Sequence, residues 1–158
     1  MQVIVLTKEQ LNTYIVDDPV RPHLSAEFRV QPSLGRFSYG LKNDSGDITA
    51  VMCVAKGRGI PTTESELERI GYEDAIGPVS VVPYTIWSYS PGAGRKLINE
   101  VISYIKNEYE SGFISLRPRV VTMSPITDIA KKFHLRNGAV LLAENNESNN
   151  FEYNIFKN

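Results

Sequence analysis

Apolar residues recur along the chain with two different periods, one typical of strands and one typical of helices. Short apolar or alternating runs predict strands at 2–6, 36–42, 47–55, 77–88, 119–123, 139–143 and 150–156. Apolar residues three and four positions apart predict helices at 8–16, 94–110 and 125–137, with short helical pieces at 23–29 and 64–70. The order of these elements predicts a single domain over residues 1–158, of the mixed α/β (α+β) class.

Turn and capping residues mark where some of these elements begin and end. The residues NDSG predict a hairpin between the second and third strands. Pro83 cannot donate a ladder hydrogen bond, which predicts a bulge or an unpaired edge inside strand 77–88. Ser124 followed by Pro125 predicts that helix 125–137 begins there. The side chains expected to face the core from that helix are Ile126, Ile129, Ala130 and Phe133.

The composition narrows the class of protein. With 17 Lys and Arg against 18 Asp and Glu, the net charge is −1, so no overall field favours nucleic acid or an anionic membrane. Cys53 is the only cysteine, which excludes an intrachain disulfide and a cysteine zinc cluster. Its apolar neighbours predict a small buried side chain. Neither a signal peptide nor a membrane-spanning run is evident, so we expect a cytoplasmic protein without a membrane partner or a metal.

The stretch SYSPGAGRKLINEV, residues 88–101, places glycines between a strand and the longest helix. One interpretation is a plain strand-to-helix turn. The other is an anion site, because the free amides of a first helical turn carry partial positive charge and glycine lets a phosphate approach closely. The stretch is not a Walker loop, since no Ser or Thr follows Lys96 at the required position. It also lacks the third glycine of the dinucleotide fingerprint.

Two motifs in the second half favour the anion site. YSPGAG (89–94) is followed by a helix and a strand, and then by TDIAKKFHLRNGA (127–139). Together they resemble the GNAT superfamily of acyl-CoA-dependent N-acyltransferases over residues 79–156. Tyr89 replaces the basic or amide residue of the first motif, and Thr127 and His134 replace Asn and Tyr of the second. More loosely, the chain also looks like a group of phage-borne acetyltransferase-like proteins.

The resemblance implies a fold and a donor. The fold would be a mixed, mostly antiparallel sheet flanked by helices, and the donor would be acetyl-CoA, with no metal. The backbone amides of residues 92–95 would bind the pyrophosphate, and the pantetheine arm would lie between strands 77–88 and 119–123. The residues implied in donor binding are Trp87, Tyr89, Gly92, Ala93, Gly94, Arg95, Thr127 and Phe133. Trp87 has a second interpretation as an ordinary core residue.

The resemblance also implies transfer of an acetyl group to a primary amine by direct attack on the thioester. A main-chain N–H between Tyr84 and Ile86 would stabilise the oxyanion. His134 occupies the usual position of a tyrosine acid, and an imidazolium with a pKa of about 6.5 could protonate the departing CoA thiolate. The alternative is a hydrogen-bonded residue at the border of the core. Ser88 or the Tyr84 hydroxyl could order a water, and no general base is evident.

Acceptor and partner stay open. A small-molecule or protein amine is favoured, whereas a Mom-like modification of adenine in DNA is possible but not favoured at this charge. A third possibility is a GNAT-shaped binding module without catalysis. The sequence leaves the oligomeric state unknown. Loop residues considered for the acceptor side, each more simply solvated, are Asp17, Asp18, His23 and Glu27. Two groups could form basic surfaces or be solvated faces: Arg21, His23, Arg29 and Arg36, or Lys131, Lys132 and Arg136.

Overall fold

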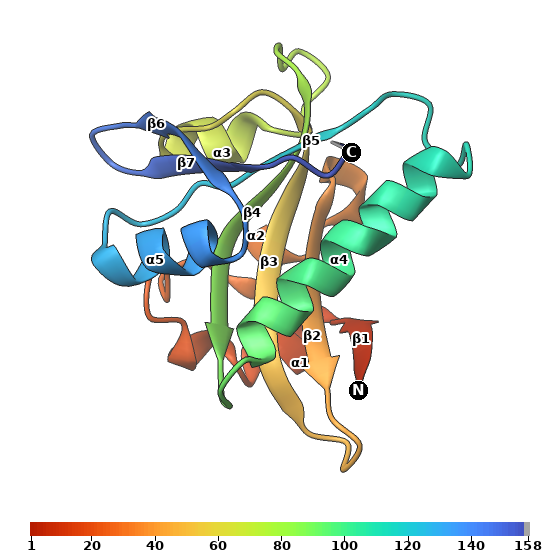
Figure 1. Ribbon diagram of the computed structural model, residues 1–158, viewed down its shortest axis with the longest axis vertical. Coiled ribbons are helices and arrows are strands. Elements are labelled where there is room, and N and C mark those ends of the chain that lie inside the picture. Colours follow the sequence, from red (N-terminus) through yellow and green to blue (C-terminus); the bar gives the residue numbers. More distant parts are fainter. Residues whose placement is uncertain (157–158) are drawn as a thin grey trace.

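The computed structural model describes residues 1–156, and one seven-stranded sheet runs through it in the order β1-β2-β3-β4-β5-β7-β6 (Figure 1). The strands are β1 (Gln2–Val5), β2 (Arg36–Lys42), β3 (Ile48–Arg58), β4 (Val79–Ser88), β5 (Arg119–Val121), β6 (Val140–Glu144) and β7 (Asn149–Tyr153). All neighbouring strands in this sheet are antiparallel except β4 and β5, which are parallel. The predicted mixed, mostly antiparallel fold is therefore confirmed.

The helices cover both faces of this sheet. They are α1 (Lys8–Asn12), α2 (Ala26–Arg29), α3 (Glu64–Arg69), α4 (Ala93–Glu110) and α5 (Asp128–Arg136). In Figure 1, α4 crosses the front of β2 and β3, α1 and α2 lie behind the sheet, and α5 lies beside β4. In the part of the chain that the structure describes, no helix combines the length and apolarity needed to span a membrane.

Two apolar cores result from the alternation of side chains along β2, β3 and β4. On one face, α4 packs its Leu97, Ile98, Val101 and Ile105 against residues such as Met52 and Val54. On the other, Leu11 of α1 and Leu67 of α3 pack with Val51, Cys53, Tyr84 and Trp87. Neighbouring residues of β3 thus point to opposite cores, as the period of a strand requires. The buried environment predicted for Cys53 is confirmed.

A bulge in β4 begins the opening between β4 and β5. Cys53 pairs with Thr85 and Val54 with Pro83, so Tyr84 is an extra residue on β4. The bulge predicted for Pro83 is therefore confirmed. The pairing of β4 with β5 covers Ser80 and Val81, and the amide of Met123 then donates to the Pro83 carbonyl at 3.1 Å. The two strands separate beyond this bond.

The last helix starts later than predicted. Ser124 is held in extended backbone by hydrogen bonds in both directions with Asn149, and Thr127 caps α5 by accepting from the amide of Ala130. The expected burial of Ile126 and Ile129 was also wrong, because these side chains are 54% and 83% exposed. The apolar residues of α5 therefore face a groove and the surface more than the core.

Smaller differences concern the ends of elements. The predicted helix 8–16 is split into α1 and a 3₁₀ turn at Ile15–Asp17. The strand predicted at 119–123 ends at Val121, where β5 leaves β4, and the strand predicted at 47–55 extends to Arg58. The strand predicted at 150–156 is shifted to β7, and β6 begins one residue later than expected.

Candidate functional site

A cleft of about 360 Å³ lies where β4 diverges from β5, between the end of β4, the start of α4 and the side of α5. Its lining is mostly apolar: Pro19, Val20, Pro83, Tyr84, Thr85, Ile86, Trp87, Ser88, Gly94, Ser124, Pro125, Thr127, Ile129, Ala130, Phe133 and His134. The β4 residues beyond the bulge pair with β3 on one side only. An extended ligand in the cleft could therefore pair with the open edge of β4.

The N-terminus of α4 meets this cleft. Gly92 is the N-cap residue with a left-handed φ of 79°, and no side chain caps the helix. The Ala93 amide donates to the Ser90 carbonyl at 3.2 Å, whereas Gly94 and Arg95 are in the first turn, where amides lack intrahelical acceptors. A Cβ at Gly92 would have no atom within 4 Å. The start of α4 suits an anion, because its first amides have no capping side chain and the space beside Gly92 is open.

Gly94 forms the narrow part of the cleft. A Cβ at this position would lie 3.6 Å from Phe133 Cε1 and 3.8 Å from Ile86 Cδ1. The helix start, the open strand edge and α5 therefore converge on one residue.

The residues implied in donor binding take several positions. Gly94, Trp87, Thr127 and Phe133 line the cleft, and the Thr127 hydroxyl is used to cap α5. Trp87 is 7% exposed and belongs to the core, as its alternative interpretation held. Its Nε1 donates to the Tyr89 hydroxyl, which donates to Asp17 at 2.7 Å. Tyr89 is thus engaged by protein groups beside the cleft.

His134 lines the cleft, but its ring is 5% exposed. Nδ1 lies 2.7 Å from the Tyr153 hydroxyl, and the ring stacks on Phe151 with centroids 5.2 Å apart. Burial lowers the pKa of His134 from 6.5 to about 4. The imidazolium expected at neutral pH is therefore not the favoured form, because among residues 1–156 no carboxylate offsets the loss of hydration.

Tyr84 and Ser88, the two residues considered for ordering a water, differ in their exposure to solvent. Tyr84 is 1% exposed, its ring lies in the core, and burial raises the pKa of its hydroxyl well above the usual value. The hydroxyl therefore lies away from bulk solvent, and its role in ordering a water stays a prediction. Ser88 is exposed and lines the cleft, and its role in ordering a water stays a prediction.

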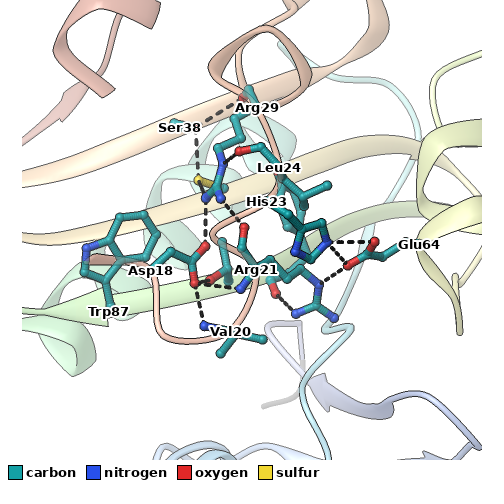
Figure 2. Close-up of polar contacts among 12 residues, drawn as sticks. Asp18, Val20, Arg21, His23, Leu24, Arg29, Ser38, Glu64 and Trp87 are labelled. Atoms are coloured by element: carbon teal, nitrogen blue, oxygen red, sulfur yellow. Dashed lines mark hydrogen bonds and ion pairs between the residues drawn. The ribbon is translucent and has the colours of Figure 1, made fainter. Parts of the chain in front are cut away.

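A buried ionic cluster supports the cleft from the N-terminal segment (Figure 2). Asp18 accepts a hydrogen bond from Arg29 Nη1 at 2.8 Å, and both side chains have no exposed surface. Arg21 is 5% exposed and Arg36 4% exposed. Neither the basic surface nor the solvated face considered for these arginines was correct, and Asp18 is not a solvated loop residue. The reason is that Leu24 and Ala26 pack this segment onto the sheet.

Sequence reasoning missed this cluster because its members occupy a segment rich in proline and charge. A usable signal was present in the capping pattern. Ser25 caps α2 by accepting from the Phe28 amide, which makes Arg29 the last residue of a short helix against the core. Among residues 1–156, no group of three His, Cys, Asp or Glu side chains is arranged to hold a metal ion.

Comparisons with known proteins add to this geometry. No family model matches the chain. No curated protein sequence matches it either. Malonyl-CoA decarboxylase from Agrobacterium vitis has a similar structure, with a TM-score of 0.61 and 19% identity over 89% of this chain. The chain spans only 38% of that protein.

Two other solved structures match over nearly the whole of both chains. AtaTR bound with acetyl-CoA gives a TM-score of 0.58 and 16% identity, over 95% of this chain and 91% of that one. AtaT complexed with acetyl-methionyl-tRNAfMet gives a TM-score of 0.55 and 15% identity, over 95% and 92%. At these identities the likeness concerns the fold. The chain has a GNAT-like fold, a mixed and mostly antiparallel sheet flanked by helices.

Proposed function

We propose that this protein is an N-acyltransferase that moves an acetyl group from acetyl-CoA to a primary amine. The observation that carries the proposal is the uncapped N-terminus of α4, which opens beside the unpaired edge of β4 on one cleft. The amides of Gly92, Gly94 and Arg95 would bind the pyrophosphate, whereas the Ala93 amide already donates to Ser90, and the Arg95 and Lys96 side chains are exposed nearby. AtaTR, which has the same fold, is bound with acetyl-CoA.

The chemistry follows from what the cleft presents. When bound, acetyl-CoA supplies a thioester carbonyl that a neutral amine can attack directly. The backbone of β4 after the bulge, from Tyr84 to Ile86, would provide an N–H to the developing oxyanion. Apolar side chains such as Phe133 and Ile86 would exclude water from the thioester. His134, neutral at pH 7, would donate or accept one hydrogen bond at the reacting end.

The acceptor belongs to the same proposal. We favour an amine on a small molecule or a protein, because the net charge is −1 and three arginines considered for a basic surface are buried. The exposed Lys131, Lys132 and Arg136 of α5 are the side chains that a nucleic acid acceptor would contact. AtaT is complexed with acetyl-methionyl-tRNAfMet and KacTA with DNA. A nucleic acid acceptor and a phage-borne origin stay predictions from the sequence.

Titration of the purified protein with acetyl-CoA tests the proposal. At a ligand concentration of 100 Kd, we expect stabilisation of about 2.7 kcal/mol, visible as a raised Tm. Turnover is then measured as release of free CoA thiol with a panel of amines. Absence of a Tm shift at millimolar acetyl-CoA contradicts the proposal. Binding without turnover on any amine favours the alternative of a GNAT-shaped binding module.

A further inference from the structure

Arg21 lies where β4 and β5 separate. Its Nη1 donates to the Tyr84 carbonyl at 2.9 Å, and its Nη2 donates to the Met123 carbonyl at 3.2 Å. The last direct bond between the two strand segments is the one from Met123 to Pro83. The guanidinium therefore takes the place of the next hydrogen bond between the two strand segments. It uses two of its N–H donors, which a planar group holds in a fixed geometry, to bridge the two carbonyls.

The segment before α2 holds Arg21 rigidly in this position (Figure 2). One carboxylate oxygen of Asp18 accepts from the amides of Val20 and Arg21, and from the Thr85 hydroxyl of β4. Arg29, which binds the other oxygen, also donates to the Arg21 carbonyl. The Arg21 side chain is 6% exposed. Swinging the side chain away would break its two buried hydrogen bonds to the Tyr84 and Met123 carbonyls, so it acts as a fixed wall.

Arg21 contacts residues that line two different cavities. The cleft described above is lined by Val20 and Tyr84. A second cavity, of about 310 Å³, is lined by Arg21 and Met123 together with Thr62, Thr63, Glu64, Ser65 and Glu147. Arg21 thus bonds to the carbonyl of one lining residue of each cavity. The guanidinium therefore occupies the space between these two linings, and we expect its removal to leave that space open.

We propose that Arg21 limits the length of the acyl group that the cleft accepts, by closing the passage between β4 and β5. This inference rests on the proposed function, in which the acyl end of the donor lies at the divergence of these strands. An acetyl group ends before the guanidinium, whereas a longer chain meets a charged, hydrogen-bonded side chain. A longer acyl chain would clash with the guanidinium if the side chain stayed in place. If the side chain moved aside, the Tyr84 and Met123 carbonyls would lose their hydrogen bonds and face an apolar chain.

The test is the affinity of the protein for a series of CoA thioesters, measured by calorimetry without an acceptor. For the natural sequence, we expect acetyl-CoA to bind at least tenfold more tightly than hexanoyl-CoA. In Arg21→Ala the order reverses, since each methylene that enters the opened passage strengthens binding by roughly fourfold. His23→Ala is the matched control, because His23 is on the same segment but is exposed and contacts Glu64 rather than the strands.

Each outcome has one meaning. Equal affinity of the natural protein for acetyl-CoA and hexanoyl-CoA overturns the proposal. A folded Arg21→Ala protein with an unchanged chain-length profile also overturns it. If Arg21→Ala does not fold, Arg21→Lys retains the charge but leaves part of the gap open, and we expect a smaller shift in the same direction. Failure of every CoA thioester to bind overturns the proposed function itself, whereas binding with an unaltered profile overturns only the role of Arg21.

Discussion

His134 and Tyr153 approach each other across the inner wall of the cleft, with Nδ1 of the histidine 2.7 Å from the tyrosine hydroxyl. Tyr153 of β7 pairs with Val120 of β5, and burial raises the pKa of its hydroxyl beyond its usual range. Both groups are therefore neutral at pH 7 and share one hydrogen bond. The bond fixes the orientation of the imidazole, leaving Nε2 as the ring nitrogen that is not engaged by Tyr153.

The first prediction concerns stability and pH. The pKa of His134 is lowered from 6.5 to about 4, so between these values the unfolded chain binds a proton that the folded chain does not. Stability from this group is fully present above pH 6.5 and is lost as the pH falls toward 4. At about 1.4 kcal/mol per pKa unit, the loss is about 3 kcal/mol.

Urea unfolding of His134→Gln and of the natural protein across this pH window checks the sign and size of the effect. We expect the natural protein to lose stability more steeply than the variant as the pH is lowered. His23→Gln, a change at an exposed histidine, should follow the natural protein. If the free energy of unfolding depends on pH in the same way for all three proteins, burial does not lower the pKa of His134.

The second prediction concerns the same residue in catalysis. In His134→Ala we expect kcat for acetyl transfer to fall by about tenfold to a hundredfold, with little change in affinity for acetyl-CoA. The reason is that the side chain lies at the reacting end of the cleft, away from the amides that would hold the pyrophosphate. Since the histidine is neutral at pH 7, kcat should show no loss of an acid between pH 6 and 7. An unaltered kcat in the variant would exclude the role.

Much of the fold could be predicted from local patterns. The spacing of Leu97, Ile98, Val101 and Ile105 predicted α4, and these side chains are buried where the pattern places them. Pro83 predicted a bulge or an unpaired edge, because proline cannot donate a hydrogen bond to a neighbouring strand, and the structure has the bulge. The position of the glycine loop at the start of α4 was also predictable, since strand, loop and helix are consecutive in the chain.

The support of the cleft could not be predicted in this way. Arg21 bonds to carbonyls 63 and 102 positions away, and no local pattern encodes such pairs. Charged side chains are usually exposed, so the sequence predicts a solvated loop residue for Asp18 and a basic surface or a solvated face for Arg29. Ser124 and Pro125 gave a plausible helix start that the bridge to Asn149 overrides. In each case a contact distant in sequence outweighed a valid local preference.

The third prediction concerns the buried pair of Asp18 and Arg29. In Asp18→Ala the guanidinium of Arg29 loses its carboxylate in a site without solvent, and we expect a loss of about 3–5 kcal/mol in the free energy of unfolding. The exposed pair of Arg69 and Asp74 provides the control, and Asp74→Ala should change stability by about 1 kcal/mol or less. Chemical denaturation measures both. A loss of similar size for the two variants would mean that Asp18 is not part of a desolvated network.

The last prediction tests the anion site at the start of α4. Gly92→Asp and Gly94→Asp each place a carboxylate against the uncapped amides, and we expect the affinity for CoA to fall at least a hundredfold. The fold should persist in both, because a Cβ at Gly92 meets no atom within 4 Å and one at Gly94 meets Phe133 at an ordinary contact distance. Asp is also among the residues that tolerate a left-handed backbone.

Gly112→Asp is the matched control for the same strain. Gly112 has a φ of 81°, close to the 79° of Gly92, and a Cβ there also meets no atom within 4 Å, but it follows the far end of α4. It should lower the Tm at least as much as Gly92→Asp, because a carboxylate is unfavourable near a helix C-terminus, and it should leave CoA affinity unchanged. If folded Gly92→Asp and Gly94→Asp proteins bind CoA as tightly as the Gly112→Asp protein, the helix start is not the pyrophosphate site. The acyl-transfer proposal would then lose the observation that carries it, because the open edge of β4 alone recognises an extended chain but not its phosphates.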